Sequence, residues 1–216
     1  MDMELIIFDL DGTLIDSCED IRQALNYCFE INGGYGGFSS DEVRKMVGEG
    51  VNILIEKALK TRKLDIPAKE MIDCFINYYR KHITDHSKLY PQVKETLEAL
   101  RGLKKAVLSN KLTELSLLAM DNLGIRQYFD FIGGSDTFKE KKPSPMPVLE
   151  IIRKFNTLPE KTAIVGDSDI DIKAGKAAGV KTIAVTHGYR EREALREADF
   201  IIDKLSDILK IIKGKF

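Results

Sequence analysis

The chain lacks an excess of charge of either sign, and this removes the electrostatic case for two classes of partner. Its 33 lysines and arginines stand against 34 aspartates and glutamates, so the formal net charge is −1. Proteins that bind nucleic acid or anionic membranes usually carry a basic patch. We therefore predict neither partner, although a small anionic substrate needs only a local positive site.

Long hydrophobic runs are also absent, and cysteine is scarce. No apolar stretch approaches the roughly 20 residues of a membrane span, and the acidic start MDMELII does not resemble a signal peptide. The three cysteines, Cys18, Cys28 and Cys74, are odd in number and lack a metal-type spacing. This argues against a disulfide framework or a zinc site and favours a reducing compartment, so we predict a cytoplasmic protein.

What the chain does contain, from about residue 89 onward, is an alternation of short apolar runs and helical patterns. Strand-like runs are centred on 106–108, 131–132, 163–165, 182–185 and 200–202. Strands that alternate with helices predict parallel βαβ units in a doubly wound, Rossmann-like α/β sheet. The length of 216 residues suits one domain or a domain with an insert.

The segment from about residue 17 to 85 has a different pattern, with apolar residues at helical spacing and no convincing strand. One predicted helical face carries Ile21 and Cys28, a second runs from Val43 to Leu59, and a third follows Pro67, a residue favoured at helix starts. We interpret residues 16–85 as a helical cap, inserted after the first strand between core segments 1–15 and 86–216.

Polar motifs follow four of the predicted strands. Each motif alone is most simply a turn or a helix cap. Together they are more informative, because ligands of open α/β sheets bind at the carboxyl ends of the strands. In chain order the motifs are Asp9-Leu10-Asp11-Gly12-Thr13, Ser109-Asn110-Lys111, Lys142-Pro143-Ser144-Pro145 and Gly166-Asp167-Ser168-Asp169, with Asp171 two residues on.

The chemistry of this set is coherent. Several carboxylates cannot converge without a cation, and a donor set made of oxygen alone predicts a hard ion such as Mg²⁺. A hydroxyl (Ser109) and an ammonium (Lys142) at the same edge suit an anion with several acceptor oxygens, such as a phosphoryl group. The carboxylates concerned are Asp9, Asp11, Asp167 and Asp171.

These four motifs resemble those of the haloacid dehalogenase-like superfamily of phosphohydrolases, and the resemblance covers nearly the whole chain. The predicted cap is similar to the small helical cap of that family. Within the family, the stretch from Asp9 to Ser17, the segment Val47-Gly48-Glu49-Gly50 and the motif Ser109-Asn110-Lys111 look most like those of phosphoglycolate phosphatases.

The resemblance implies roles for individual residues. Asp9 would be the nucleophile that forms an aspartyl-phosphate, and Asp11 the general acid and base. The catalytic set would be completed by Ser109 and Lys142, which would hold the phosphoryl oxygens. Mg²⁺ would be bound by Asp9, Asp11 (through its carbonyl oxygen) and Asp167. Asp171 would be a further ligand, a residue that holds a ligand in place, or a partner of Lys142.

The expected substrate is a small phosphorylated metabolite, with 2-phosphoglycolate as first choice. Lys111 or Arg44 would meet its second anion, and the predicted substrate-binding residues are completed by Gly12, Thr13 and Asn110. A solvated helix face is an equally good interpretation of Arg44. We expect structural or surface roles for His82, His86, His187, Tyr78 and Tyr79.

Several alternatives stay open at this point. A sugar phosphomutase similar to β-phosphoglucomutase, a pyrophosphatase or a nucleotidase would share the fold and both acids. Dehalogenases and phosphonatases lack the second acid, so Asp11 argues against them. A binding module without activity is disfavoured because every acid is present. We expect a monomer or a homodimer.

Overall fold

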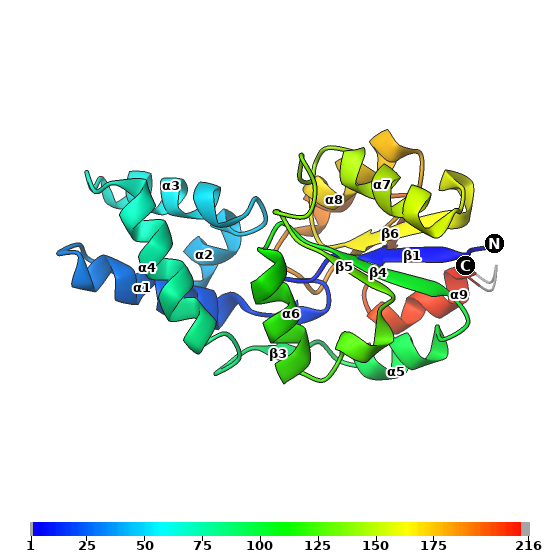
Figure 1. Cartoon of the computed structure of the whole chain (residues 1–216), viewed down its shortest axis with the longest axis horizontal. Coiled ribbons are helices and arrows are strands. Elements are labelled where there is room, and N and C mark those ends of the chain that lie inside the picture. Colours follow the sequence, from blue (N-terminus) through cyan, green and yellow to red (C-terminus); the bar gives the residue numbers. More distant parts are fainter. Residues whose placement is uncertain (1, 213–216) are drawn as a thin grey trace.

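The computed structural model describes residues 2–212 and contains a six-stranded sheet between two layers of helices (Figure 1). All neighbouring strands of this sheet run parallel. The predicted α/β class is therefore confirmed. In spatial order the strands are β5 (Phe131–Gly133), β4 (Lys104–Leu108), β1 (Leu5–Phe8), β6 (Thr162–Gly166), β7 (Lys181–Val185) and β8 (Phe200–Ile202).

The register of the central strands explains why the polar motifs meet. Phe8, the last residue of β1, lies opposite Val107 of β4 on one side and Val165 of β6 on the other. The residues that follow these three strands therefore leave the sheet at one edge. Alternate side chains of β1 face opposite helical layers, with Ile7 packed in one buried cluster and Phe8 in the other.

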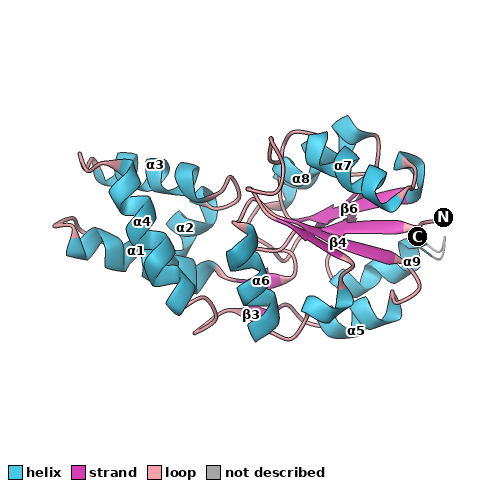
Figure 2. Ribbon diagram, in the orientation of Figure 1, coloured by secondary structure: helices cyan, strands magenta, loops and turns pink. Residues whose placement is uncertain are grey.

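Within residues 2–212, five α-helices cover the two faces of the sheet (Figure 2). One layer consists of α7 (Met146–Phe155) and α8 (Asp169–Ala178), and the opposite layer of α5 (Val93–Ala99), α6 (Thr113–Asn122) and α9 (Ile208–Ile212). Short 3₁₀ turns connect these elements at Arg126–Tyr128, Pro159–Lys161, Arg192–Leu195 and Leu205–Asp207. Among the described residues, no helix has the length and apolarity to cross a bilayer.

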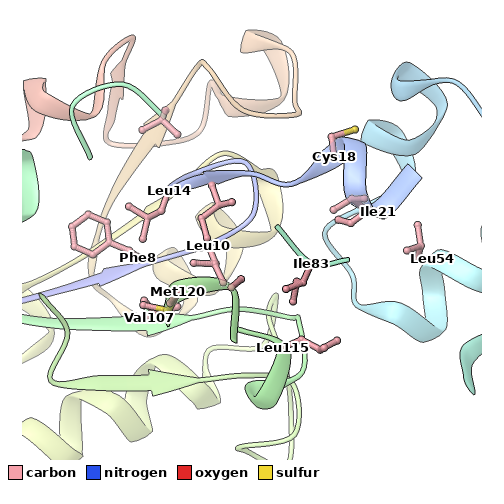
Figure 3. Close-up of a cluster of buried hydrophobic side chains, with 14 of the residues drawn as sticks. Phe8, Leu10, Leu14, Cys18, Ile21, Leu54, Ile83, Val107, Leu115 and Met120 are labelled. Atoms are coloured by element: carbon pink, nitrogen blue, oxygen red, sulfur yellow. The ribbon is translucent and has the colours of Figure 1, made fainter. Parts of the chain in front are cut away.

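A second group of helices lies beyond the carboxyl ends of the strands and forms the cap (Figure 1). Its members are α1 (Cys18–Ile31), α2 (Ser40–Met46), α3 (Val51–Arg62) and α4 (Ala68–Lys81). Apolar packing is continuous from the sheet into the cap: Phe8 and Val107 belong to the same buried cluster as Ile21 and Leu54 (Figure 3). The exact boundaries of the cap stay a prediction.

The helical face expected from Val43 to Leu59 is interrupted, which corrects one prediction. The helix α2 ends at Met46 and α3 begins at Val51, because Gly48 and Gly50 have φ angles of +121° and +87°. These values are strained for residues with a side chain. The apolar spacing continues across the break, so periodicity alone did not reveal it.

The expectation of no disulfide was also wrong, because the structure joins Cys28 to Cys74. The two residues are 46 positions apart in sequence, but α1 and α4 pack against each other and bring them together. Spacing along the chain carries no information about such a tertiary contact. Cys18 is a free, buried cysteine.

Two short strands join the cap to the core and were not predicted. The outgoing chain forms β2 (Ile15–Asp16) and the returning chain forms β3 (Lys88–Leu89), and the two pair in antiparallel fashion. The buried carboxylate of Asp20 reinforces this crossing. It accepts hydrogen bonds from the backbone N–H groups of His86 and Ser87 at 2.9 and 2.8 Å.

Candidate active site

The four polar motifs converge on one cavity between the sheet edge and the cap. The cavity has a volume of about 70 Å³, and residues from all four motifs line it, among them Asp9, Ser109, Lys142 and Asp167. The parallel register of β1, β4 and β6 causes this convergence. The four motifs thus lie at one edge of the sheet, as the order of the predicted strands indicated.

Three carboxylates form the centre of the site. Asp9, Asp167 and Asp171 each offer an oxygen, and these atoms lie within 4.8 Å of one another. Burial raises the pKa of Asp9 to about 8 and the pKa of Asp167 to about 7, despite the nearby Lys142. A cluster that is costly to ionise in the bare protein favours a bound cation.

The side chain of Asp167 is closely surrounded by backbone, so its position is fixed. A Cβ atom added at Gly12 would lie 2.3 Å from Asp167 Oδ2, and one added at Gly188 would lie 2.2 Å from Asp167 Cβ. The backbone N–H of Tyr189 donates to Asp167 Oδ2 at 2.7 Å. Oxygen donors in a fixed position fit a hard divalent cation such as Mg²⁺.

Lys142 connects two of the three acids. Its Nζ lies 2.7 Å from Asp9 Oδ1 and 2.6 Å from Asp171 Oδ1, and its side chain is only 2% exposed. Burial disfavours the ammonium form, but Asp171 and Asp9 keep the pKa of Lys142 above its ordinary value. Asp171 also accepts from the Ser168 hydroxyl at the start of α8. Of the three roles predicted for Asp171, its contacts are those of a partner of Lys142.

Asp11 has a different environment from Asp9. Its carboxylate does not belong to the three-carboxylate group; it accepts from Lys111 Nζ at 2.6 Å and from the hydroxyl of Ser17. Lys111 Nζ also donates to Tyr79 Oη of the cap at 3.0 Å. Burial raises the pKa of Tyr79 to about 12, so this phenol stays protonated. The two acids of the first motif therefore have separate lysines.

The motif that follows β4 has a positioning role as well as a place in the cavity. Asn110 Nδ2 donates to the carbonyl of Gly48 in the cap and to the carbonyl of Lys142, both at 2.9 Å. Ser109 Oγ accepts from the N–H of Lys111 at 3.2 Å. Asn110 thus joins two of the motif loops to the cap, and its buried Oδ1 has no partner among the described residues.

Three predicted substrate-binding residues do not line the cavity. Arg44 is 44% exposed and lies 3.8 Å from Asp41, as expected for a solvated helix face. The hydroxyl of Thr13 is buried and points to Asp167 Oδ1 at 3.4 Å. Gly12 contributes its lack of a side chain beside Asp167 rather than a cavity surface.

Several residues that line the cavity were not predicted from the sequence. Tyr79 was interpreted as packing, and Tyr189 and Arg190 were not considered. The latter two follow β7 at the same edge of the sheet as the four motifs, and this position was a usable signal. The cap contributes an apolar wall that includes Ile21, Leu54 and Phe75.

Comparison with known proteins agrees with this geometry. The sequence profile of haloacid dehalogenase-like hydrolases matches residues 6–185, and the chain belongs to that family. It is 44% identical over 212 residues to a phosphoglycolate phosphatase of Aquifex aeolicus, with 97% of each chain covered. A phosphoglycolate phosphatase of Chromobacterium violaceum is 34% identical over 218 residues, with 98% of this chain and 97% of the relative covered.

A solved structure gives the same result. A predicted phosphoglycolate phosphatase from Haemophilus somnus superposes with a TM-score of 0.92 at 33% identity, and 98% of each chain is covered. The family resemblance that the four motifs predicted is therefore confirmed.

Proposed function

We propose that this protein is a Mg²⁺-dependent phosphatase that hydrolyses a small phosphorylated metabolite, 2-phosphoglycolate in the first instance. The observation that carries the proposal is the arrangement of the two acids, Asp9 beside Lys142 and the carboxylate cluster, and Asp11 beside Lys111. One fold thus supplies two carboxylates in two environments, as a nucleophile and an acid–base group require. The relatives named phosphoglycolate phosphatase support the same activity.

In the proposed reaction a carboxylate oxygen of Asp9 attacks phosphorus. The bond from phosphorus to the ester oxygen breaks, and Asp11 gives its proton to the leaving alkoxide, which departs as an alcohol. Asp11 then accepts a proton from a water molecule, whose oxygen attacks the aspartyl-phosphate. Inorganic phosphate leaves and both carboxyl groups return to their starting forms.

The metal would be held by Asp9, Asp167 and the carbonyl oxygen of Asp11. When bound, Mg²⁺ offsets the repulsion between an anionic nucleophile and an anionic phosphate. The ammonium of Lys142 offsets the same repulsion, because it contacts both Asp9 and Asp171. Ser109 would donate its hydroxyl proton to a phosphoryl oxygen, where charge must be balanced in the transition state.

The wall of the cavity favours a small acid over a phosphosugar as the substrate. A sugar phosphomutase or a nucleotidase needs several donors and acceptors for hydroxyl groups, whereas the cap contributes Ile21, Leu54 and Phe75 here. Lys111 is the lining cation beside Asp11 that could meet a second anion. The volume of about 70 Å³ likewise suits a compact substrate.

The test is phosphate release from a panel that contains 2-phosphoglycolate, glucose 1-phosphate, pyrophosphate and a nucleoside monophosphate. We expect the highest kcat/KM with 2-phosphoglycolate and loss of activity when EDTA removes the metal. A tenfold preference for another member corresponds to about 1.4 kcal/mol of transition-state stabilisation. It would rule out 2-phosphoglycolate as the preferred substrate but not the phosphatase activity. An isomerised phosphosugar in place of free phosphate would reject both. Light scattering tests the predicted monomer or homodimer.

A further inference from the structure

At the end of α2, main-chain carbonyl groups of the cap accept hydrogen bonds from the core. This docking segment, residues 44–49, accepts hydrogen bonds from three core side chains. Arg190 donates to the carbonyls of Arg44 and Val47, Asn110 to that of Gly48 and Lys141 to that of Glu49. In Figure 1 this part of the cap, in cyan, reaches toward the sheet.

Arg190 differs from the other two donors, because it makes two of these contacts at the C-terminal end of a helix. The last carbonyls of a helix have no partner within it, and they carry a partial negative charge that attracts cations. α2 ends at Met46, so the carbonyl of Arg44 has no continuing helical N–H to accept from. The planar guanidinium offers several donors in a fixed fork. It therefore suits two carbonyls on one helix end.

The loop that carries Arg190 also contacts the proposed catalytic centre. One residue earlier, the N–H of Tyr189 donates to Asp167, and the hydroxyl of Tyr189 accepts from the N–H of Ser17 at the start of the cap at 2.9 Å. The loop that contacts the docking segment therefore also contacts a carboxylate of the site. The acceptors of the docking segment are backbone atoms, and Gly48 leaves room for the guanidinium, because a Cβ atom added there would lie 3.3 Å from Arg190 Nη2.

We propose that Arg190 is a positioning residue that holds the cap closed by capping the C-terminus of α2 from the core. A site that transfers phosphate must exclude bulk water while it reacts. Arg190 would favour the closed arrangement through contacts that only that arrangement permits. The effect of Arg190 on turnover rests on the proposed phosphatase function, whereas the effect of Arg190 on cap closure does not.

The first measurement is hydrogen–deuterium exchange of the free protein at amides 43–50. We expect Arg190→Gln to accelerate exchange there by about tenfold, which corresponds to about 1.4 kcal/mol, and Arg190→Lys to give a smaller increase. Arg192→Gln is the matched control. Arg192 lies two residues further along the chain but pairs with Asp203 on the surface, so exchange at 43–50 should not change. Equal exchange in wild type, Arg190→Gln and Arg192→Gln would overturn the proposal.

The second measurement is substrate selection. A cap that opens more easily should raise KM for 2-phosphoglycolate more than it lowers kcat. It should also shift the kcat/KM ratio about tenfold in favour of a bulky aryl ester such as p-nitrophenyl phosphate. A residue that only stabilised the fold would lower both activities together, and that result would overturn the proposal. If wild type hydrolyses neither compound nor any other member of the panel, the proposed function fails, and the exchange experiment still tests Arg190.

Discussion

The pairing of Lys142 with two acids predicts an unusually costly substitution, Lys142→Met. Methionine is similar in length but leaves Asp9 and Asp171 without their shared cation in a site where the lysine is 2% exposed. Removing one partner of a buried ion pair typically costs about 3–5 kcal/mol. At about 2–4 °C per kcal/mol for a chain of this size, Tm should fall by about 6–20 °C.

Thermal denaturation monitored by circular dichroism in EDTA measures this loss. Lys173→Met is the matched control, because Lys173 pairs with Asp169 on the surface and its side chain is 60% exposed, so no resolvable change is expected. Adding Mg²⁺ should stabilise Lys142→Met more than wild type, since a second cation can offset the unpaired acids. Adding Asp171→Asn to Lys142→Met should restore part of the lost stability. A Tm near that of wild type, or strictly additive losses in the double variant, would refute the reasoning.

Three further substitutions and one chemical reduction test other parts of the structure. Asp9→Asn should reduce phosphate release to background while the fold, followed by circular dichroism, is retained. Asp11→Ala should lower kcat by about 10²–10⁴-fold with Mg²⁺ affinity by calorimetry nearly unchanged; a collapse of that affinity would contradict the assignment. Asp20→Asn weakens the acceptor at the crossing between cap and core, and should cost about 1.5–3 kcal/mol in urea denaturation. Opening the Cys28–Cys74 bond with a reductant should cost up to about 4 kcal/mol for a 46-residue separation; a Cys28→Ser variant that denatures like wild type would count against this.

The parts of the site that sequence could predict are those determined by local order. Asp9 and Asp167 directly follow apolar runs of a few residues, and such runs are buried strands in a parallel sheet. Once β1 and β6 are neighbours, the register brings these acids to one edge without further information. The end of α8 is equally local, because Gly179 directly follows this helix and its φ of +74° suits glycine.

The parts that could not be predicted depend on contacts between distant segments. Tyr79 repeats at the spacing of a packed helix, and only the position of α4 over the sheet edge brings its hydroxyl to Lys111. The disulfide between Cys28 and Cys74 depends in the same way on how α1 meets α4. Arg190 contacts backbone carbonyls, which every residue type possesses, so no sequence pattern in the cap identifies its acceptors.

Lys142 and Lys111 differ in the partners that hold them, and this difference bears on the order of the proposed reaction steps. Lys142 contacts Asp9 and Asp171, which both belong to the core, so neither of its ion pairs involves the cap. Lys111 contacts Asp11 and also Tyr79, which belongs to the cap helix α4. If the cap opened, Asp9 would therefore keep its contact with Lys142. Lys111, the lysine beside Asp11, would lose its contact with Tyr79. We therefore expect the environment of the proposed acid to be complete only when the cap is closed over a substrate, where bulk water cannot compete for the proton.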